Sequence, residues 1–105
     1  MTGFYATFSI PATGAIAAGR AQSKLKEWTI ISTDTEATSM DQLKSGDLDA
    51  IMGQTPTMVG TKAIDDAHAV ALGKPVSAKV TAPISVITQA NADTADVYKT
   101  KQGDC

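Results

Sequence analysis

The stretch DLDAIMGQTPTMVG, residues 47–60, contains a short apolar run followed at once by a glutamine and a Thr-Pro pair. The apolar run at 50–52, between polar flanks, predicts a short buried strand. Thr55 and Pro56 are typical of the N-cap and the first position of a helix. Gln54 is therefore expected at the carboxyl end of a strand. Because ligands of open α/β sheets bind in the crevice outside such ends, Gln54 is a candidate ligand contact.

The rest of the chain repeats this alternation of strand and helix. Strands are expected at 3–8, 27–33, 49–53 and 82–89, and helical patterns follow the first three of them. Three strand-helix units and a last strand predict an α/β fold, a three-layer α/β/α arrangement with a mainly parallel sheet and right-handed crossovers. We expect one domain over residues 1–90 and a polar C-terminal tail over residues 91–105.

The expected helix ends rest on local capping signals. Ser9 can cap the first helix, and Gly46 is suited to close the second in a left-handed conformation. Two capping boxes are possible before or within the second helix, Thr33-x-x-Glu36 and Thr38-x-x-Asp41.

Composition excludes several classes of partner. The 105 residues are 43% hydrophobic and 19% charged, with nine basic residues and a net charge of −2. Because the basic residues form no cluster, we expect neither nucleic acid nor an anionic membrane as partner. No run approaches the ~20 apolar residues of a membrane-spanning helix, and Met1 is not followed by a basic segment, so we also expect no signal peptide in this chain.

Three candidate reactive sites fail on spacing. Gly14 and Gly19 have the separation of a phosphate-binding loop, but the lysine and hydroxyl that should follow are absent. Asp65 and Asp66 are neighbours on an expected helix and point about 100° apart, so they cannot act on one bond. His68 is the only histidine, and no nucleophile accompanies it. We therefore expect no enzyme activity, no metal and no cofactor.

Polar and aromatic residues follow the three parallel strands at one edge of the sheet. These strands are expected to end at Phe8, Asp34 and Gln54, with Ser9 next in the chain. A carboxylate beside an amide can satisfy the donors and acceptors of vicinal hydroxyl groups, and an aromatic ring can cover the C–H side of a sugar. The site therefore suits a neutral sugar or polyol. Two simpler interpretations remain: Asp34 could cap the next helix, and Gln54 could pair with backbone.

Three segments carry a resemblance to a known family: ISTDT at 31–35, LKSGDLDAIMGQTP at 43–56, and MVGTKAID with LGKPV at 58–76. Over residues 3–90 the chain resembles the C-terminal half of ribose-binding-protein-like periplasmic sugar-binding proteins of ABC transporters. LacI-type repressors share this ligand domain.

The resemblance implies ligand contacts at Asp34 and Gln54. The family commonly has Asn-Asp where this chain has Phe8 and Ser9, which removes a hydroxyl-binding amide and leaves the identity of the sugar open. The resemblance further implies a non-catalytic, periplasmic solute-binding protein whose partner is an ABC transporter permease. The alternatives are an effector domain of a LacI-type regulator, or an isolated fragment that binds no ligand because the second lobe of the cleft is missing.

We also expect a homo-oligomer. The family places a strand beside the one at Gly3–Phe8, and that neighbour precedes Met1 here, which would leave an edge free to pair with another chain. The Pro56–Leu72 helix carries an apolar stripe that the resemblance assigns to contact with the missing lobe, so the copies are expected to join through the Gly3–Phe8 edges or by exchange of this helix.

Overall fold

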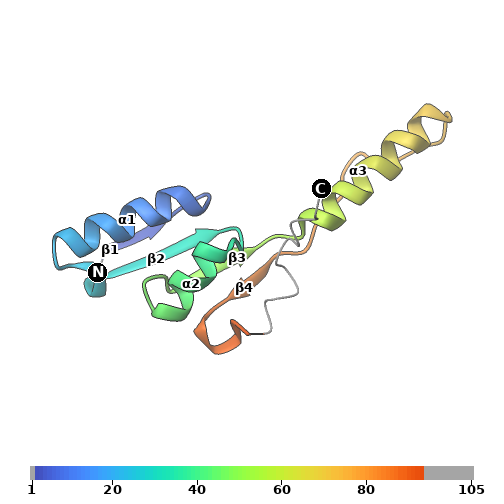
Figure 1. Ribbon diagram of the computed structural model, residues 1–105. Coiled ribbons are helices and arrows are strands. Elements are labelled where there is room, and N and C mark those ends of the chain that lie inside the picture. The colour runs from blue at the N-terminus through green and yellow to red at the C-terminus, as the bar shows by residue number, and fades with distance from the viewer. Residues whose placement is uncertain (1, 94–105) are drawn as a thin grey trace.

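The computed structural model describes residues 2–93, in which strands alternate with helices (Figure 1). The strands are β1 (Thr2–Tyr5), β2 (Trp28–Thr33), β3 (Ala50–Gly53) and β4 (Ser85–Ile87). The α-helices are α1 (Ser9–Ala21), α2 (Ala37–Ser45) and α3 (Pro56–Ala71), and two short 3-10 turns are η1 (Leu25–Glu27) and η2 (Gln89–Asn91).

The four strands form one sheet in the order β1-β2-β3-β4. β1 and β3 both run parallel to β2, with Tyr5 beside Ile31 and Ile31 beside Ala50. β4 is antiparallel to β3. The predicted α/β class with a mainly parallel sheet is therefore confirmed. β1 ends at Tyr5 rather than at the predicted Phe8.

Helices α1 and α2 lie on the same face of this sheet. The amide of Gln42 in α2 donates to the hydroxyl of Thr13 in α1 at 3.1 Å, which ties the two helices together. Within residues 2–93, α1 and α2 thus form a helical layer on one face of the sheet. The helical layer that was predicted for the other face is not present in these residues. The core lies between this layer and the sheet, and its most deeply buried side chains are Ala12, Ile16, Ile30, Met40, Leu43, Leu48, Ile51 and Ile87.

Trp28 belongs to this packing. The ring of Trp28 lies 4.8 Å from that of Phe4, and a Cβ placed on Gly19 would come within 3.0 Å of it. Only glycine therefore lets α1 approach the sheet this closely. Ala92 is also buried in the core, so the folded part includes residues just beyond η2.

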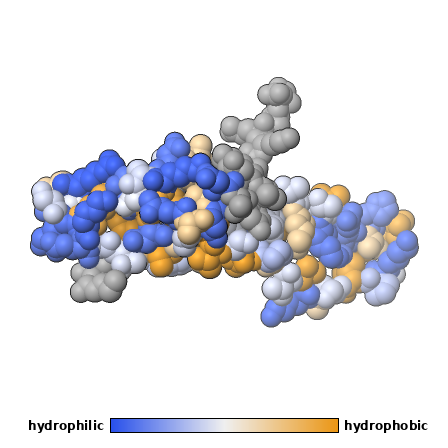
Figure 2. All heavy atoms as spheres, turned by 90° about the horizontal axis from the view of Figure 1, so that it is seen from below, coloured by the Kyte–Doolittle hydropathy of each residue, from blue (hydrophilic) through white to orange (hydrophobic). Residues whose placement is uncertain are grey.

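The opposite face of the sheet is more exposed at its two edge strands than at its centre, where Ile31 and Met52 are half-buried. Tyr5 is 62% exposed and Val86 is 56% exposed on this face, whereas Ile30 and Ile51 on the core face are fully buried. Figure 2 shows hydrophobic atoms at the surface over the middle of the molecule and again towards one end.

Two helix starts differ from the local predictions. Ser9 is the first residue of α1, and the N-cap position falls on Phe8 without a side-chain cap. α2 begins after Glu36, again with no side-chain cap, so neither predicted capping box forms. The side chains of Ser9 and Glu36 instead form a longer-range contact that is described below. The predicted role of Gly46 is confirmed, because it closes α2 at φ 77°.

The segment from Pro56 to Ile84 leaves the sheet as an arm. We call residues 56–84 the arm and the remaining described residues, 2–55 and 85–93, the body. Thr55 and Pro56 occupy the predicted N-cap and first helical positions of α3, yet α3 contains no buried residue. The chain measures 59 Å along its longest axis (Figure 1) and has a radius of gyration of 17.2 Å. A compact chain of this length would have about 13 Å.

Of the helices within residues 2–93, none combines the length and the apolar character that crossing a membrane requires.

Candidate functional site

Asp34 and Gln54 contact each other at the edge where β2 and β3 end. The side-chain amide nitrogen of Gln54 donates to Oδ1 of Asp34 at 2.8 Å. Each residue directly follows its strand, and the parallel pairing of the strands brings the two ends together. The sequence predicted both residues at this edge, and the structure brings them into hydrogen-bond contact.

Asp34 has an unusual backbone conformation. Its φ is 76°, in the left-handed region that aspartate tolerates better than most residues. Its backbone N–H donates to the carbonyl of Met52 at 3.3 Å, which fastens the turn to β3. Because α2 has its N-cap at Glu36 with no side-chain cap, Asp34 does not serve as the helix cap that the simpler interpretation required.

Ser9 and Glu36 form a second link across the same edge. The hydroxyl of Ser9 donates to Oε2 of Glu36 at 2.8 Å, and Ser9 itself is only 6% exposed. This bond joins the first residue of α1 to the loop after β2. Ser9 therefore supports Glu36 and is not among the residues that line the cavity described next.

A shallow cavity of about 240 Å³ opens beside the Asp34–Gln54 pair. Its lining consists of Asp34, Thr35, Glu36, Gln54 and Pro56. The sequence missed Glu36 as a site residue because its spacing from Thr33 suggested a capping box. Only the contact with Ser9, 27 positions away, reveals its place.

Phe8 is the remaining predicted site residue. It lies at the N-cap of α1 and is 46% exposed, in an extended conformation at φ −162°. It is not among the cavity-lining residues. The strand that precedes Phe8, β1, is held to β2 by a hydrogen bond of 3.0 Å between the hydroxyl groups of Tyr5 and Thr33.

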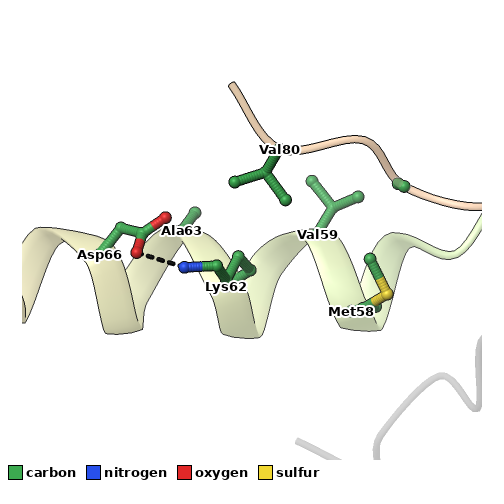
Figure 3. Close-up of a pocket in the computed structure, with 7 residues that line it drawn as sticks. Met58, Val59, Lys62, Ala63, Asp66 and Val80 are labelled. Carbon is green, nitrogen blue, oxygen red and sulfur yellow. Dashed lines mark hydrogen bonds and ion pairs between the residues drawn. The ribbon is translucent and has the colours of Figure 1, made fainter. Parts of the chain in front are cut away.

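The arm has a cavity of its own, of about 200 Å³, between α3 and the returning segment (Figure 3). Met58, Val59 and Val80 line it, and an ion pair between Lys62 and Asp66 lies along one side. His68 is exposed on α3. Within residues 2–93, no group of three His, Cys, Asp or Glu side chains could hold a metal ion.

The fold has relatives among solved structures, although no model of a protein family and no curated sequence matches the chain. An Agrobacterium radiobacter carbohydrate-transporter solute-binding protein in complex with D-arabinose superposes with a TM-score of 0.80 at 26% identity, over 92% of this chain and 34% of that one. A Mycobacterium smegmatis protein in complex with β-D-fucofuranose gives 0.77 at 28% identity, over 90% and 32%. An Agrobacterium vitis ABC-transporter solute-binding protein bound to α-D-tagatopyranose gives 0.82 at 21% identity, over 92% and 33%.

The similarity to these structures extends over nearly the whole of this chain, including its strands, its helices and the arm. The chain spans about a third of the length of each of them. Its structural neighbours are sugar-binding proteins of ABC transporters, of the type I periplasmic class. The chain therefore has the α/β fold found in one lobe of these type I periplasmic sugar-binding proteins.

Proposed function

We propose that the chain forms one side of a sugar-binding site in a non-catalytic solute-binding protein of an ABC transporter. The observation that carries the proposal is the hydrogen bond between Gln54 and Asp34 beside the strand-end cavity. The structural neighbours, several of which hold sugars, support the same interpretation.

The pair has the chemistry that vicinal hydroxyl groups need. A carboxylate accepts hydrogen bonds only, whereas a glutamine amide both donates and accepts. One sugar hydroxyl can therefore donate to Asp34 while its neighbour pairs with Gln54. We assign Phe8 the role of covering the C–H face of the ring, and Ser9 the role of holding Glu36 at the rim.

The described residues provide only one side of such a site. Because half a cleft buries little ligand surface, we expect the chain alone to bind monosaccharides no more tightly than about 1 mM, or ~4 kcal/mol. Micromolar affinity of the 105-residue chain for any monosaccharide would contradict this expectation.

The test is an NMR titration of the ¹⁵N-labelled chain with D-arabinose. We expect the side-chain amide signal of Gln54 to move, and Asp34→Ala to abolish the movement. The control is Asp65→Ala, which removes a carboxylate from the exposed surface of α3 and should leave the titration unchanged. An unmoved Gln54 signal across D-arabinose, D-fucose and D-allose would refute the site.

The transport role extends to partner and location. We assign the parent protein an ABC permease as partner and a place outside the cytoplasm. A helix-turn-helix encoded directly upstream would contradict this and favour a LacI-type regulator. An export signal with neighbouring permease genes would support it.

The proposal also includes self-association of the chain. Within residues 2–93 β1 has a single strand neighbour, β2, and its Phe4 and Tyr5 are 38% and 62% exposed. Such an edge pairs readily with a second copy, and closed two-fold symmetry is the commonest outcome. We expect light scattering at tens of micromolar to give twice the 10.9 kDa chain mass. A monomer mass would refute the association.

A further inference from the structure

The cavity beside Gln54 is acidic. Its lining includes the two carboxylates of Asp34 and Glu36 and no Lys, Arg or His. Each carboxylate accepts a hydrogen bond of 2.8 Å from a neutral group, the Gln54 amide and the Ser9 hydroxyl respectively. The ion pairs that the structure gives within residues 2–93 involve neither of them. The described walls thus carry two negative charges with no cation paired to them.

We propose that Asp34 and Glu36 make this site select sugars by charge. A 2-amino-2-deoxy sugar, which carries an ammonium group, is favoured over the neutral sugar of the same shape, and the neutral sugar is favoured over a uronate. This inference rests on the proposed function, because it concerns ligands of the same cavity. It assigns Glu36 a role in specificity, whereas Asp34 and Gln54 hold the hydroxyl groups.

The physical basis is the attraction between opposite charges in a partly solvated cleft. One pair of unit charges about 4 Å apart changes an affinity by roughly fivefold in water, and more where water is excluded. The same charges repel a uronate carboxylate by a comparable factor. Because both effects are electrostatic and the cleft is open, salt near 0.5 M should weaken them strongly.

The experiment compares D-glucosamine, D-glucose and D-glucuronate in titrations of the full 105-residue chain at about pH 6 and matched low ionic strength. The signal followed is the side-chain amide of Gln54. We expect glucosamine to bind roughly three- to tenfold more tightly than glucose, and glucose at least about threefold more tightly than glucuronate. In about 0.5 M salt the three affinities should converge.

Glu36→Gln provides the decisive variant, since glutamine still accepts a hydrogen bond from Ser9 but carries no charge. We expect it to lower the ratio of glucosamine to glucose affinity by about threefold. Asp65→Asn makes the same change of charge on the exposed surface of α3 and should leave the ratio unaltered.

Several outcomes would overturn the inference. Equal affinities for the three sugars would do so, as would an unchanged ratio in Glu36→Gln or an equal loss in Asp65→Asn. Methylammonium binding as tightly as glucosamine would show attraction of ions without a sugar site. If glucose moves the Gln54 signal and binds as tightly as glucosamine, the proposed function stands and this inference fails. If no sugar moves it, both fail.

Discussion

The body and the arm are built from one chain but held together in different ways. In the body, α1 and α2 cover one face of the sheet and bury side chains such as Leu43 and Ile51 completely. In the arm, α3 has 16 residues and none of them is buried. Helices in proteins gain most of their stability from packing of an apolar face rather than from the helix itself. The body therefore has a core of its own, whereas the arm needs a partner to gain one.

The largest expected effect of this difference is on amide hydrogen exchange. Exchange in β2 requires opening of the core, whereas exchange in α3 requires only local fraying. We expect protection factors in β2 to exceed those in α3 by at least about a thousandfold, equivalent to ~4 kcal/mol. Equal protection of the β2 and α3 amides in dilute solution would contradict this difference between the body and the arm. Protection of α3 that grows with protein concentration would sharpen it, by showing that a second copy covers the arm.

The next effect concerns side-chain truncation in the two regions. Ile51 is fully buried, so Ile51→Ala should lower the free energy of unfolding by about 2–5 kcal/mol. Val70 in the arm is 58% exposed, and Val70→Ala should change it by less than about 0.5 kcal/mol. Urea denaturation followed by circular dichroism measures both. A loss at Val70 comparable to that at Ile51 would mean that the arm is packed in solution.

Replacement of two glycines by alanine should change stability in opposite directions. Gly46 has φ 77°, and a Cβ there would come within 3.2 Å of the Gln89 amide, so Gly46→Ala should destabilise by about 1–2 kcal/mol. Gly60 lies inside α3, and a Cβ there would meet no atom beyond its chain neighbours and the helix's own backbone within 4 Å, so Gly60→Ala should stabilise the helix by about 0.5–1 kcal/mol. Urea midpoints test the first, and the helical signal at 222 nm tests the second. A fall in helicity in Gly60→Ala would contradict the description of α3.

The smallest effect is expected from the ion pairs. Arg20 pairs with Asp47, which also accepts a hydrogen bond of 2.9 Å from Ser45. Arg20→Gln should cost about 0.5–1 kcal/mol. Lys62 pairs with Asp66 one turn along α3, and Lys62→Gln should cost only about 0.3–0.5 kcal/mol. Thermal unfolding at low and high salt checks both values. A cost that does not decline in high salt would contradict an electrostatic origin.

The centres of the strands could be predicted because buried strands of a parallel sheet need apolar residues, and β2 and β3 have them. Their ends depend on the neighbouring strand. β1 ends at Tyr5 because its pairing with β2 ends at Ile31. The layer arrangement also depends on contacts between distant segments, such as that between Gln42 and Thr13.

The residues of the candidate site also include some that the sequence predicts and one that it does not. Asp34 and Gln54 could be predicted together because parallel strands end at a common edge, whatever their length. Glu36 could not, since its side chain is held by Ser9, the first residue of α1. The local pattern favoured capping for both residues, but a tertiary hydrogen bond uses their side chains instead. Short-range signals therefore predict the elements better than they predict which polar side chains pair between distant segments.

The antiparallel pairing of β3 with β4 has a consequence for how the molecule could be divided. Gly53 lies beside Ser85, and the hydroxyl of Thr55 donates to the carbonyl of Pro83 at 3.4 Å, so the chain leaves and re-enters the sheet at one place. Residues 54–84 thus occupy the position of a β-hairpin loop and are topologically an insertion. A two-residue Asn-Gly turn would close the same hairpin. Replacing residues 54–84 by such a turn would then leave the four-stranded sheet intact while removing Gln54. Folding of the sheet could thus be studied separately from ligand recognition.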